Sequence, residues 1–250
     1  MTELFHDEGH GFDLFGLHPP TLERAARASA PLYEKYFRVD SEGADHIPAE
    51  GPVIVIANHG GVLPIDAAML CLDLLRQTKR IPRAISDHFV PRLPLISTLF
   101  ARFGVVSGTR ANVKRLLERG ELLAIWPEGV AGPAKRFRDR YHLQKWRVGF
   151  AELAIRYRAI VVPAAILGAE ESWPLLAKLR LHAFGSPYLP IPASPVPLPT
   201  HYHIRYGSPL KLAGLDPDDP HSVSIAAHVA RAALERLIAD ARMARRGIFR

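Results

Sequence analysis

Four short strand-like runs, three of them aliphatic, recur along the chain, and stretches with helical spacing separate them. The runs cover residues 53–56, 122–125, 160–162 and 203–206. The first three lack the alternating polar residues of a half-exposed strand, which is typical of strands covered by helices on both faces. The order of elements therefore predicts an α/β fold: a single domain with a mixed, mainly parallel sheet flanked by helices.

The second half of the chain supports two further structural predictions. Asp219 and Pro220 indicate the start of a long final helix, because Asp is a favoured N-cap residue and Pro suits the first helical position. Six prolines fall between residues 186 and 199, which predicts an extended connector on the surface. Helix and strand patterns continue on both sides of this connector, so it does not indicate a second core.

Composition and charge narrow the possible compartment and the possible partners of the protein. The chain has one cysteine, Cys71, and begins with a polar, acidic segment, which together favour a reducing, cytoplasmic compartment. Its longest uncharged apolar run, residues 159–169, is shorter than the roughly 20 residues that a membrane-spanning helix needs. The net charge of +7 favours anionic partners such as phosphate groups, an anionic membrane surface, nucleic acid or an acidic carrier protein.

The strongest candidate for catalytic chemistry follows the first strand run. Asn58, His59, Gly60 and Gly61 come directly after it, at the sheet edge where α/β proteins bind ligands. Two glycines allow a substrate to approach the backbone closely. Asp66, in the first turn of the next helix, can accept a proton from one imidazole nitrogen and leave the other as a base. The same residues are also compatible with a strand cap and a carboxylate that complements the helix dipole.

Three further patterns supply candidate binding residues. Gly104 and Arg110 bracket a short strand and a glycine turn, and the guanidinium fork of arginine suits a phosphate or a carboxylate. Arg110 is equally consistent with a surface residue that begins a helix. Glu128 and Gly129 follow another strand run, where a carboxylate can bind a substrate hydroxyl or end the strand in a turn. Pro163 lies inside a strand run, which predicts an edge strand or a bulge.

In this order and spacing, the patterns resemble the motifs of the glycerolipid acyltransferase superfamily, which includes acylglycerol-phosphate and lysophospholipid acyltransferases. The resemblance extends from about Val53 to Glu171. Six residues, instead of the usual four, separate His59 from Asp66, so either the loop bulges or the dyad is broken. Trp126 replaces the more usual phenylalanine of the third motif. The altered first motif is similar to a diverged branch near the mono- and diacylglycerol acyltransferase-like members.

The resemblance implies a glycerolphosphate-acyltransferase-like fold and an O-acyltransferase in which His59 is the general base and Asp66 assists it. The donor would be acyl-CoA or an acyl-carrier protein, and the acceptor a hydroxyl of a glycerolipid or lysophospholipid, with no cofactor, no metal and no nucleic acid. The implied substrate-binding residues are Asn58, Gly60, Gly61, Gly104, Arg110, Glu128 and Gly129. Residues 1–40 would form a helical, interfacial segment and residues 41–250 the acyltransferase domain.

A lipid acceptor requires access to a membrane, and we expect the protein to lie peripherally on its inner face. Two apolar segments suit an interface, although core packing also explains them. The first contains Phe12, Leu14, Phe15 and Leu17, and the second contains Phe89, Val90, Leu93, Leu95, Ile96, Leu99, Phe100 and Phe103. A basic run of Lys135, Arg136, Arg138, Arg140, Lys145 and Arg147 follows the third motif. This run suits lipid head groups, the phosphates of CoA, an acidic carrier protein or a solvated loop.

Two other function classes stay open. A non-catalytic lipid-binding protein of the same fold is consistent with the altered spacing between His59 and Asp66. A metal hydrolase is suggested by the 12 histidines, of which His201 and His203 share a strand face, but the chain has no His-Glu-x-x-His motif. It has no Gly-x-Ser-x-Gly nucleophile elbow either. A hydrogen bond between His59 and Asp66 would favour the acyltransferase over the binding protein.

Overall fold

The computed structural model describes residues 10–249 apart from 62, 89, 94 and 180–188. Within these residues, one seven-stranded sheet has the order β1-β9-β6-β2-β5-β3-β4. Its strands are β1 (Asp40–Glu42), β2 (Val53–Ala57), β3 (Pro82–Ser86), β4 (Val106–Ser107), β5 (Leu122–Ile125), β6 (Ile160–Leu167) and β9 (His203–Tyr206). All neighbours pair in parallel except β6 with β9. The predicted mixed, mainly parallel sheet is therefore confirmed.

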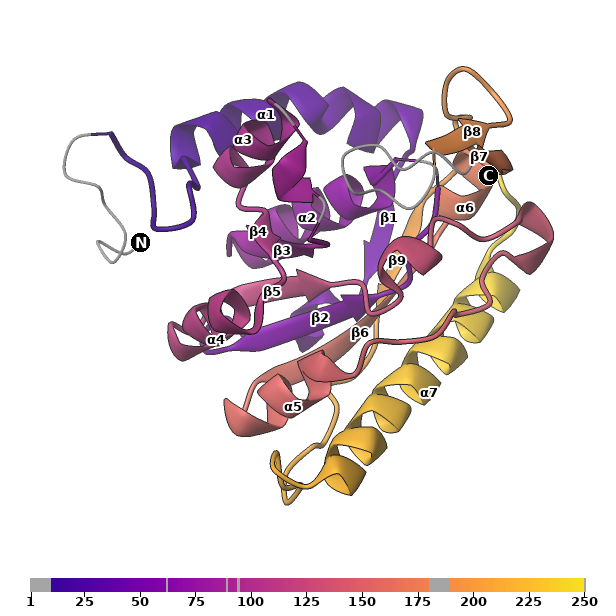
Figure 1. Ribbon diagram of the computed structural model, residues 1–250. Helices are drawn as coiled ribbons and strands as arrows, with labels where there is room; N and C mark the ends of the chain where they lie inside the picture. The colour runs from indigo at the N-terminus through magenta and orange to yellow at the C-terminus, as the bar shows by residue number, and fades with distance from the viewer. Residues whose placement is uncertain (1–9, 62, 89, 94, 180–188, 250) are drawn as a thin grey trace.

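Helices cover both faces of this sheet, as Figure 1 shows. The α-helices are α1 (Pro19–Pro31), α2 (Ile65–Thr78), α3 (Ile96–Arg102), α4 (Arg110–Glu118), α5 (Gly149–Arg156), α6 (Ala169–Ser172) and α7 (Pro220–Ala244). Short turns of π-helix (Leu32–Tyr36) and 3₁₀-helix (Ala44–His46, Val90–Arg92, Gly129–Ala131, Phe137–Asp139) lie between them. The predicted start of α7 is confirmed, because Asp219 accepts hydrogen bonds from the backbone N–H groups of His221 and Ser222.

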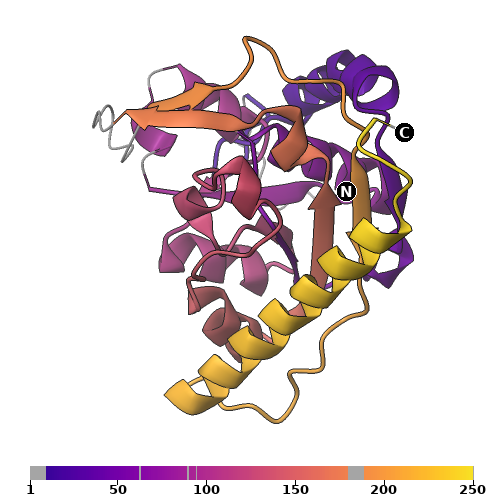
Figure 2. The same ribbon diagram turned by 90° about the vertical axis from the view of Figure 1, so that its right-hand side faces the viewer.

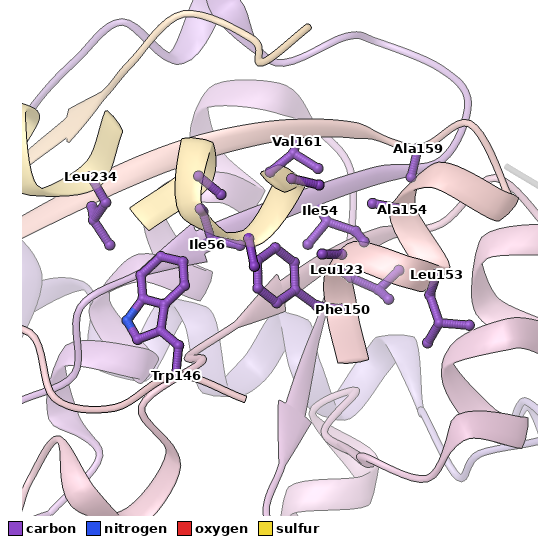
Figure 3. Close-up of a cluster of buried hydrophobic side chains, with 14 of the residues drawn as sticks. Ile54, Ile56, Leu123, Trp146, Phe150, Leu153, Ala154, Ala159, Val161 and Leu234 are labelled. Carbon is purple, nitrogen blue, oxygen red and sulfur yellow. The ribbon is translucent and has the colours of Figure 1, made fainter. Parts of the chain in front are cut away.

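An apolar layer on each face of the sheet forms the core. On one face, side chains of β2, β5 and β6 pack against α4, α5 and α7, and Trp146 and Phe150 fill the space between them (Figure 3). On the other face, α2 packs against the sheet together with Tyr33 and Phe37. Every side chain of β2 is fully buried, which explains why its sequence has no polar alternation.

Pro163 lies in an interior strand, because β6 is between β2 and β9, which corrects the expectation of an edge strand. The other alternative, a bulge, agrees with the pairing, because the register shifts by one residue between the pairs Val161–Leu210 and Ala164–Tyr206. The antiparallel ladder to β9 begins at the pair Ala164 and Tyr206, one residue after the proline. The Pro163 carbonyl accepts a hydrogen bond from the Gly207 N–H at 2.8 Å. The N–H that proline lacks thus falls between the two pairs, in a stretch where the regular ladder is already interrupted.

The proline-rich connector is partly a strand instead of an extended loop. Leu189–Pro192 forms β8 and pairs with β7 (Leu175–Leu179) in an antiparallel hairpin, which projects from the main body in Figure 2. Both strands of a two-stranded hairpin are edges, so the prolines of β8 are tolerated. Residues 186–188 of the predicted connector lie outside the described residues.

The expected N-terminal helical segment contains α1, and the residues after it, Tyr33 and Phe37, are buried against the sheet. A domain boundary at residue 40 stays a prediction. In the part of the chain that the structure describes, no helix combines the length and the apolar composition that a membrane crossing requires.

Candidate active site

The chain turns sharply after β2, at the carboxyl edge of the parallel strands. Gly61 adopts a φ of +87°, which favours glycine, and the chain then enters α2 one residue before Asp66. This path brings the Asp66 carboxylate back towards the strand end, so that its Oδ2 lies 2.7 Å from His59 Nδ1. The loop therefore bulges enough for Asp66 to reach His59 across the longer spacing.

Asp66 is almost completely buried and holds the imidazole from one side. Its Oδ2 also accepts a hydrogen bond from the Gly60 N–H at 3.0 Å. Because a carboxylate only accepts hydrogen bonds, Nδ1 of neutral His59 carries the proton and Nε2 keeps its lone pair. Burial lowers the pKa of the His59 imidazole, but the attraction and hydrogen bond of Asp66 outweigh burial and raise that pKa above its ordinary value.

Asn58 fixes the end of β2 to the neighbouring strand β6. Its Nδ2 donates to the Ile166 carbonyl at 2.9 Å, and its Oδ1 accepts from the Ile166 N–H at 2.8 Å. The residue is 1% exposed, and both polar groups of its side chain are used by one backbone unit. This arrangement sets the position of His59 relative to β6.

Glu128, which follows β5, connects two neighbouring segments to each other. Its Oε1 accepts the backbone N–H of His59 at 3.2 Å, and its Oε2 accepts the N–H of Gln144 at 2.7 Å. Gly129 follows with a φ of +54°, and a Cβ there would lie 3.2 Å from the Asp87 carboxylate. A side chain at this position would meet both a strained backbone and a close neighbour.

Lys135 and Glu170 complete a buried charge network that sequence reasoning missed. Lys135 Nζ lies 2.9 Å from Glu170 Oε1 and 3.4 Å from Glu128 Oε2, and its side chain is 3% exposed. The other oxygen of Glu170 accepts the Tyr141 N–H at 3.0 Å. Burial raises the pKa of Glu170, although Lys135 opposes this effect. The network ties together the loops that follow β5 and β6, and through Glu128 it also holds the His59 loop.

Gly132 is a second residue that the sequence did not single out. A Cβ at this position would lie 2.8 Å from His59 Cβ and 2.9 Å from the His59 carbonyl oxygen, which is too close for any side chain. Only glycine therefore allows the segment after β5 to pack directly on His59. Its place in a Gly-Pro turn was the one signal in the sequence.

Gly104 and Arg110, which correspond to the second motif of the superfamily, do not belong to the group of residues around His59. Gly104 precedes β4, and its nearest backbone neighbour is the carbonyl of Pro82 at the beginning of β3, which is the opposite end of these parallel strands. Arg110 follows β4, but its side chain is 65% exposed and donates to Glu152 of α5 at 2.8 Å. By contrast, hydrogen bonds link His59, Gly60, Asp66 and Glu128 into one group. Asn58 precedes His59 and anchors it to Ile166 of β6.

The two expected interfacial segments differ in exposure. In the first segment Leu17 is buried and Leu14 is 58% exposed. In the second, Leu95 is 87% exposed, and Ile96 and Leu99 are each 46% exposed. Phe89 of that segment lies outside the described residues. Leu63, within the His59 loop itself, is 51% exposed, so apolar side chains reach the surface next to the candidate site as well.

The histidine pair that suggested a metal hydrolase lies elsewhere on the sheet. The rings of His201 and His203 are 4.2 Å apart between centroids, and His203 belongs to β9, which β6 separates from β2. His203 Nδ1 lies 3.4 Å from Asp40. No group of three or more His, Cys, Asp or Glu side chains among the described residues is arranged to hold a metal ion.

The sequence and the fold are both similar to those of known proteins. The sequence model of the Acyltransferase family matches residues 38–167. An uncharacterized protein of Mycobacterium tuberculosis is 37% identical over 228 residues, which cover 84% of this chain and 64% of that protein. The human DGAT1/2-independent enzyme synthesizing storage lipids is 31% identical over 163 residues, which cover 63% of this chain and 49% of the enzyme. The chain thus spans less than two thirds of the length of these relatives.

Among solved structures, the fold is similar to that of the 1-acyl-sn-glycerophosphate (LPA) acyltransferase PlsC from Thermotoga maritima. The TM-score is 0.57 at 17% sequence identity, and the likeness covers 90% of this chain and 84% of the other. At this identity the likeness concerns the fold alone. The family match extends over just more than half of the chain and contains β2, the loop that joins His59 to Asp66, β5 and β6. The chain belongs to the Acyltransferase family.

Proposed function

We propose that this chain transfers a fatty acyl group from an acyl thioester to a hydroxyl of a glycerolipid or lysophospholipid. The observation that carries the proposal is the 2.7 Å contact between His59 Nδ1 and the buried Asp66, at the carboxyl edge of the sheet in a member of the Acyltransferase family. Glycerolipid chemistry is supported by the names of two similar proteins, one synthesizing storage lipids and one acting on LPA.

In the proposed reaction, Nε2 of His59 removes the proton of the acceptor hydroxyl as its oxygen attacks the thioester carbonyl carbon. The C–S bond then breaks, the acyl group remains on the acceptor oxygen as an ester, and the imidazolium returns the proton to the departing thiolate. No residue of the enzyme needs to form a covalent bond. A positioned base contributes about 10²–10⁴-fold, so alignment of two bound substrates and stabilisation of the oxyanion supply most of the remaining rate enhancement.

The other residues of the group have positioning roles in this proposal. Asp66 orients the imidazole, and Asn58 and Glu128 hold the backbone on either side of it. Gly60 and Gly61 have no side chains, so a substrate can approach the backbone next to His59. The donor in this proposal is acyl-CoA or an acyl-carrier protein.

The proposed acceptor resides in a membrane, and the exposed apolar residues Leu63, Leu95, Ile96 and Leu99 support peripheral contact with one. The net charge of +7 favours an anionic surface. Flotation with vesicles tests this part of the proposal: binding to anionic vesicles supports it, and failure to bind them contradicts it.

Thioester consumption by the purified protein tests the reaction itself. Acyl-CoA and then acyl-carrier protein are offered with lysophosphatidic acid, monoacylglycerol and diacylglycerol in turn, beside the His59→Ala variant. Turnover that disappears in the variant supports the acyltransferase and identifies the acceptor. Silence with every combination favours the alternative, a lipid-binding protein of the same fold that does not catalyse.

A further inference from the structure

The β7–β8 hairpin exposes apolar side chains on an arm that projects from the main body (Figure 2). Leu176 is 71% exposed and Leu179 is 50% exposed, and Val196 and Leu198, which follow β8, are exposed as well. A two-stranded hairpin is at best marginally stable by itself in water, and an exposed apolar patch is typical of an interaction site. We therefore expect a partner to cover these side chains.

The base of the hairpin, by contrast, has a fixed position on the protein. The Trp173 indole N–H donates to the Ser194 carbonyl at 2.8 Å and joins the two sides of the base. The Tyr36 hydroxyl, from the segment after α1, donates to the Pro197 carbonyl at 2.6 Å. The exposed arm is thus anchored to the body at its base.

The hairpin lies at the same edge of the sheet as His59. It follows β6 and the short helix α6, and the His59 loop follows β2, which pairs with β6 in parallel. The carboxyl ends of these two strands are therefore neighbours. Trp173, at the base of the hairpin, lines a small cavity together with Gly60 and Gly61 of the His59 loop. A surface that covers the hairpin consequently lies next to the candidate active site.

Both strands of the hairpin are poor templates for an added strand. β8 contains Pro190 and Pro192, which have no N–H to donate, and the register of β7 shifts between Leu175 and Ala177. Prolines and bulges are features by which natural edge strands avoid pairing with another chain. They disfavour a protein partner that extends the sheet and favour a partner that covers side chains without pairing with the backbone.

The charge of this region suits an anionic partner. From Ser172 to Leu215 the sequence has no Asp or Glu, so all 25 acidic residues of the chain lie outside this stretch. Lys178 of β7 is exposed and supplies a positive charge. Exposed apolar side chains with cations and without carboxylates among them are typical of elements that bind anionic lipid surfaces. The hairpin therefore fits a membrane with anionic head groups.

We propose that the β7–β8 hairpin inserts into an anionic membrane surface and places the carboxyl edge of the sheet, with His59, against the lipid. The inference rests on the proposed acyl transfer and deepens it, because it names the element that enters the membrane and the edge of the sheet that faces it. Insertion is shallow, since the open edges of a hairpin need hydrogen-bond partners that only head groups and water supply. Leu63, exposed on the His59 loop, meets the same surface.

Vesicle flotation of the full chain with paired variants tests the hairpin. Leu176→Gln combined with Leu179→Gln removes two exposed apolar side chains without a change of charge, so the melting temperature should stay close to that of the wild type. On vesicles of phosphatidylglycerol and phosphatidylcholine, we expect the double variant to bind at least about tenfold more weakly than the wild type.

Ile225→Gln is the matched control. Ile225 is 39% exposed and lies near the start of α7, at the end of that helix which is far from the hairpin in Figure 1. This variant should change vesicle binding by less than about twofold, because the surface around it does not meet the membrane in the proposed orientation.

A fluorescent label measures how deeply the hairpin inserts. Leu176→Cys in a Cys71→Ser background carries an environment-sensitive dye, and Ile225→Cys in the same background is its control. On anionic vesicles the dye at position 176 should emit at shorter wavelength. Lipids brominated near the head groups should quench it more than lipids brominated near the chain ends. The dye at position 225 should show neither change.

Three outcomes would overturn the inference. The first is a double variant that binds vesicles as well as Ile225→Gln does. The second is a dye at position 176 that stays in water while the protein is bound. The third is a wild type that forms dimers in solution and a double variant that is monomeric, because the hairpin then packs against a second copy of this chain.

The flotation and thioester experiments separate this inference from the proposed reaction. Loss of vesicle binding in the double variant, together with silence in every thioester assay, would support the hairpin and contradict the acyl transfer. Turnover that depends on His59, together with unchanged vesicle binding in the double variant, would support the acyl transfer and contradict the hairpin.

Discussion

The first and second motifs of this chain stand at the ends of two parallel strands, yet their surroundings differ. His59 lies among buried groups: the side chains of Asp66 and Glu128 are fully buried, and each accepts a hydrogen bond from the His59 loop. Arg110 is 65% exposed and is paired with one carboxylate of a neighbouring helix. Burial of a carboxylate is costly unless hydrogen bonds or a cation compensate for it, whereas an exposed ion pair is almost neutral. We therefore expect the chemistry to centre on the first motif and not on the second.

The largest effect is expected from His59→Ala. Loss of the general base should reduce acyl transfer by about 10²–10⁴-fold, because the imidazole that removes the hydroxyl proton in the proposed reaction is gone. Thioester consumption and ester formation should fall together. The melting temperature and circular dichroism spectrum should stay close to those of the wild type, and a folded variant with near-normal turnover would contradict the assigned role.

Lys135→Met should have the largest effect on stability. It leaves Glu128 and Glu170 buried without their cation, which we expect to cost about 3–5 kcal/mol in the free energy of unfolding. Lys114→Met is the matched control, because Lys114 pairs with Glu118 on the surface and the same change there should cost under about 0.5 kcal/mol. Urea titration measures both. Equal losses of unfolding free energy in the two variants would contradict the expectation that the buried ion pairs contribute more to stability than the exposed one.

Gly132→Ala should have an intermediate effect. The new methyl group would overlap His59 Cβ and the His59 carbonyl, so the backbone must shift, at a cost of about 1–3 kcal/mol. Activity should fall further than this loss of stability explains, because the shift moves the base. Gly149→Ala serves as the control, since a Cβ at Gly149 meets nothing within 4 Å. An unchanged kcat in Gly132→Ala would show that the close packing on His59 is unimportant.

The smallest effect is expected from Arg110→Ala. An exposed ion pair contributes about 0–1 kcal/mol, and Glu152 keeps Arg156 as a second partner. Thermal or urea unfolding should therefore detect a change below about 1 kcal/mol. A loss as large as that of Lys135→Met would mean that the second motif is as tightly integrated as the first.

Much of the fold could be predicted because the central strands are buried on both faces. All four strand runs are confirmed as β2, β5, β6 and β9, and the N-cap of α7 is confirmed at Asp219. The interior position of Pro163 could not be predicted, since it depends on where the ladder to β9 begins. The strand in the proline-rich connector depends likewise on its partner β7.

The candidate site was predictable in part. The sequence left open whether the loop bulges so that Asp66 reaches His59 or whether the dyad is broken. The spacing alone does not show how a glycine loop folds. The basic run included Lys135, but its burial and its ion pair with Glu170 were not predicted. Lys and Glu are almost never fully buried, so a basic run indicates a solvated surface unless its carboxylate partners are known. Glu170 lies 35 residues after Lys135 in the sequence, and only the fold brings the two side chains together.

The pH dependence of kcat/KM in the wild type and in Asp66→Asn tests the dyad most directly. Only neutral His59 can act as the base, and Asp66 stabilises the protonated form, so wild-type activity should rise with pH through a pKa above the ordinary histidine value of about 6.5. In Asp66→Asn the rise should move to lower pH, because the charge of Asp66 no longer opposes the effect of burial, which lowers the His59 pKa, and the plateau should fall by about 10²-fold. An identical profile and plateau in the two proteins would contradict the central claim that His59 and Asp66 act together.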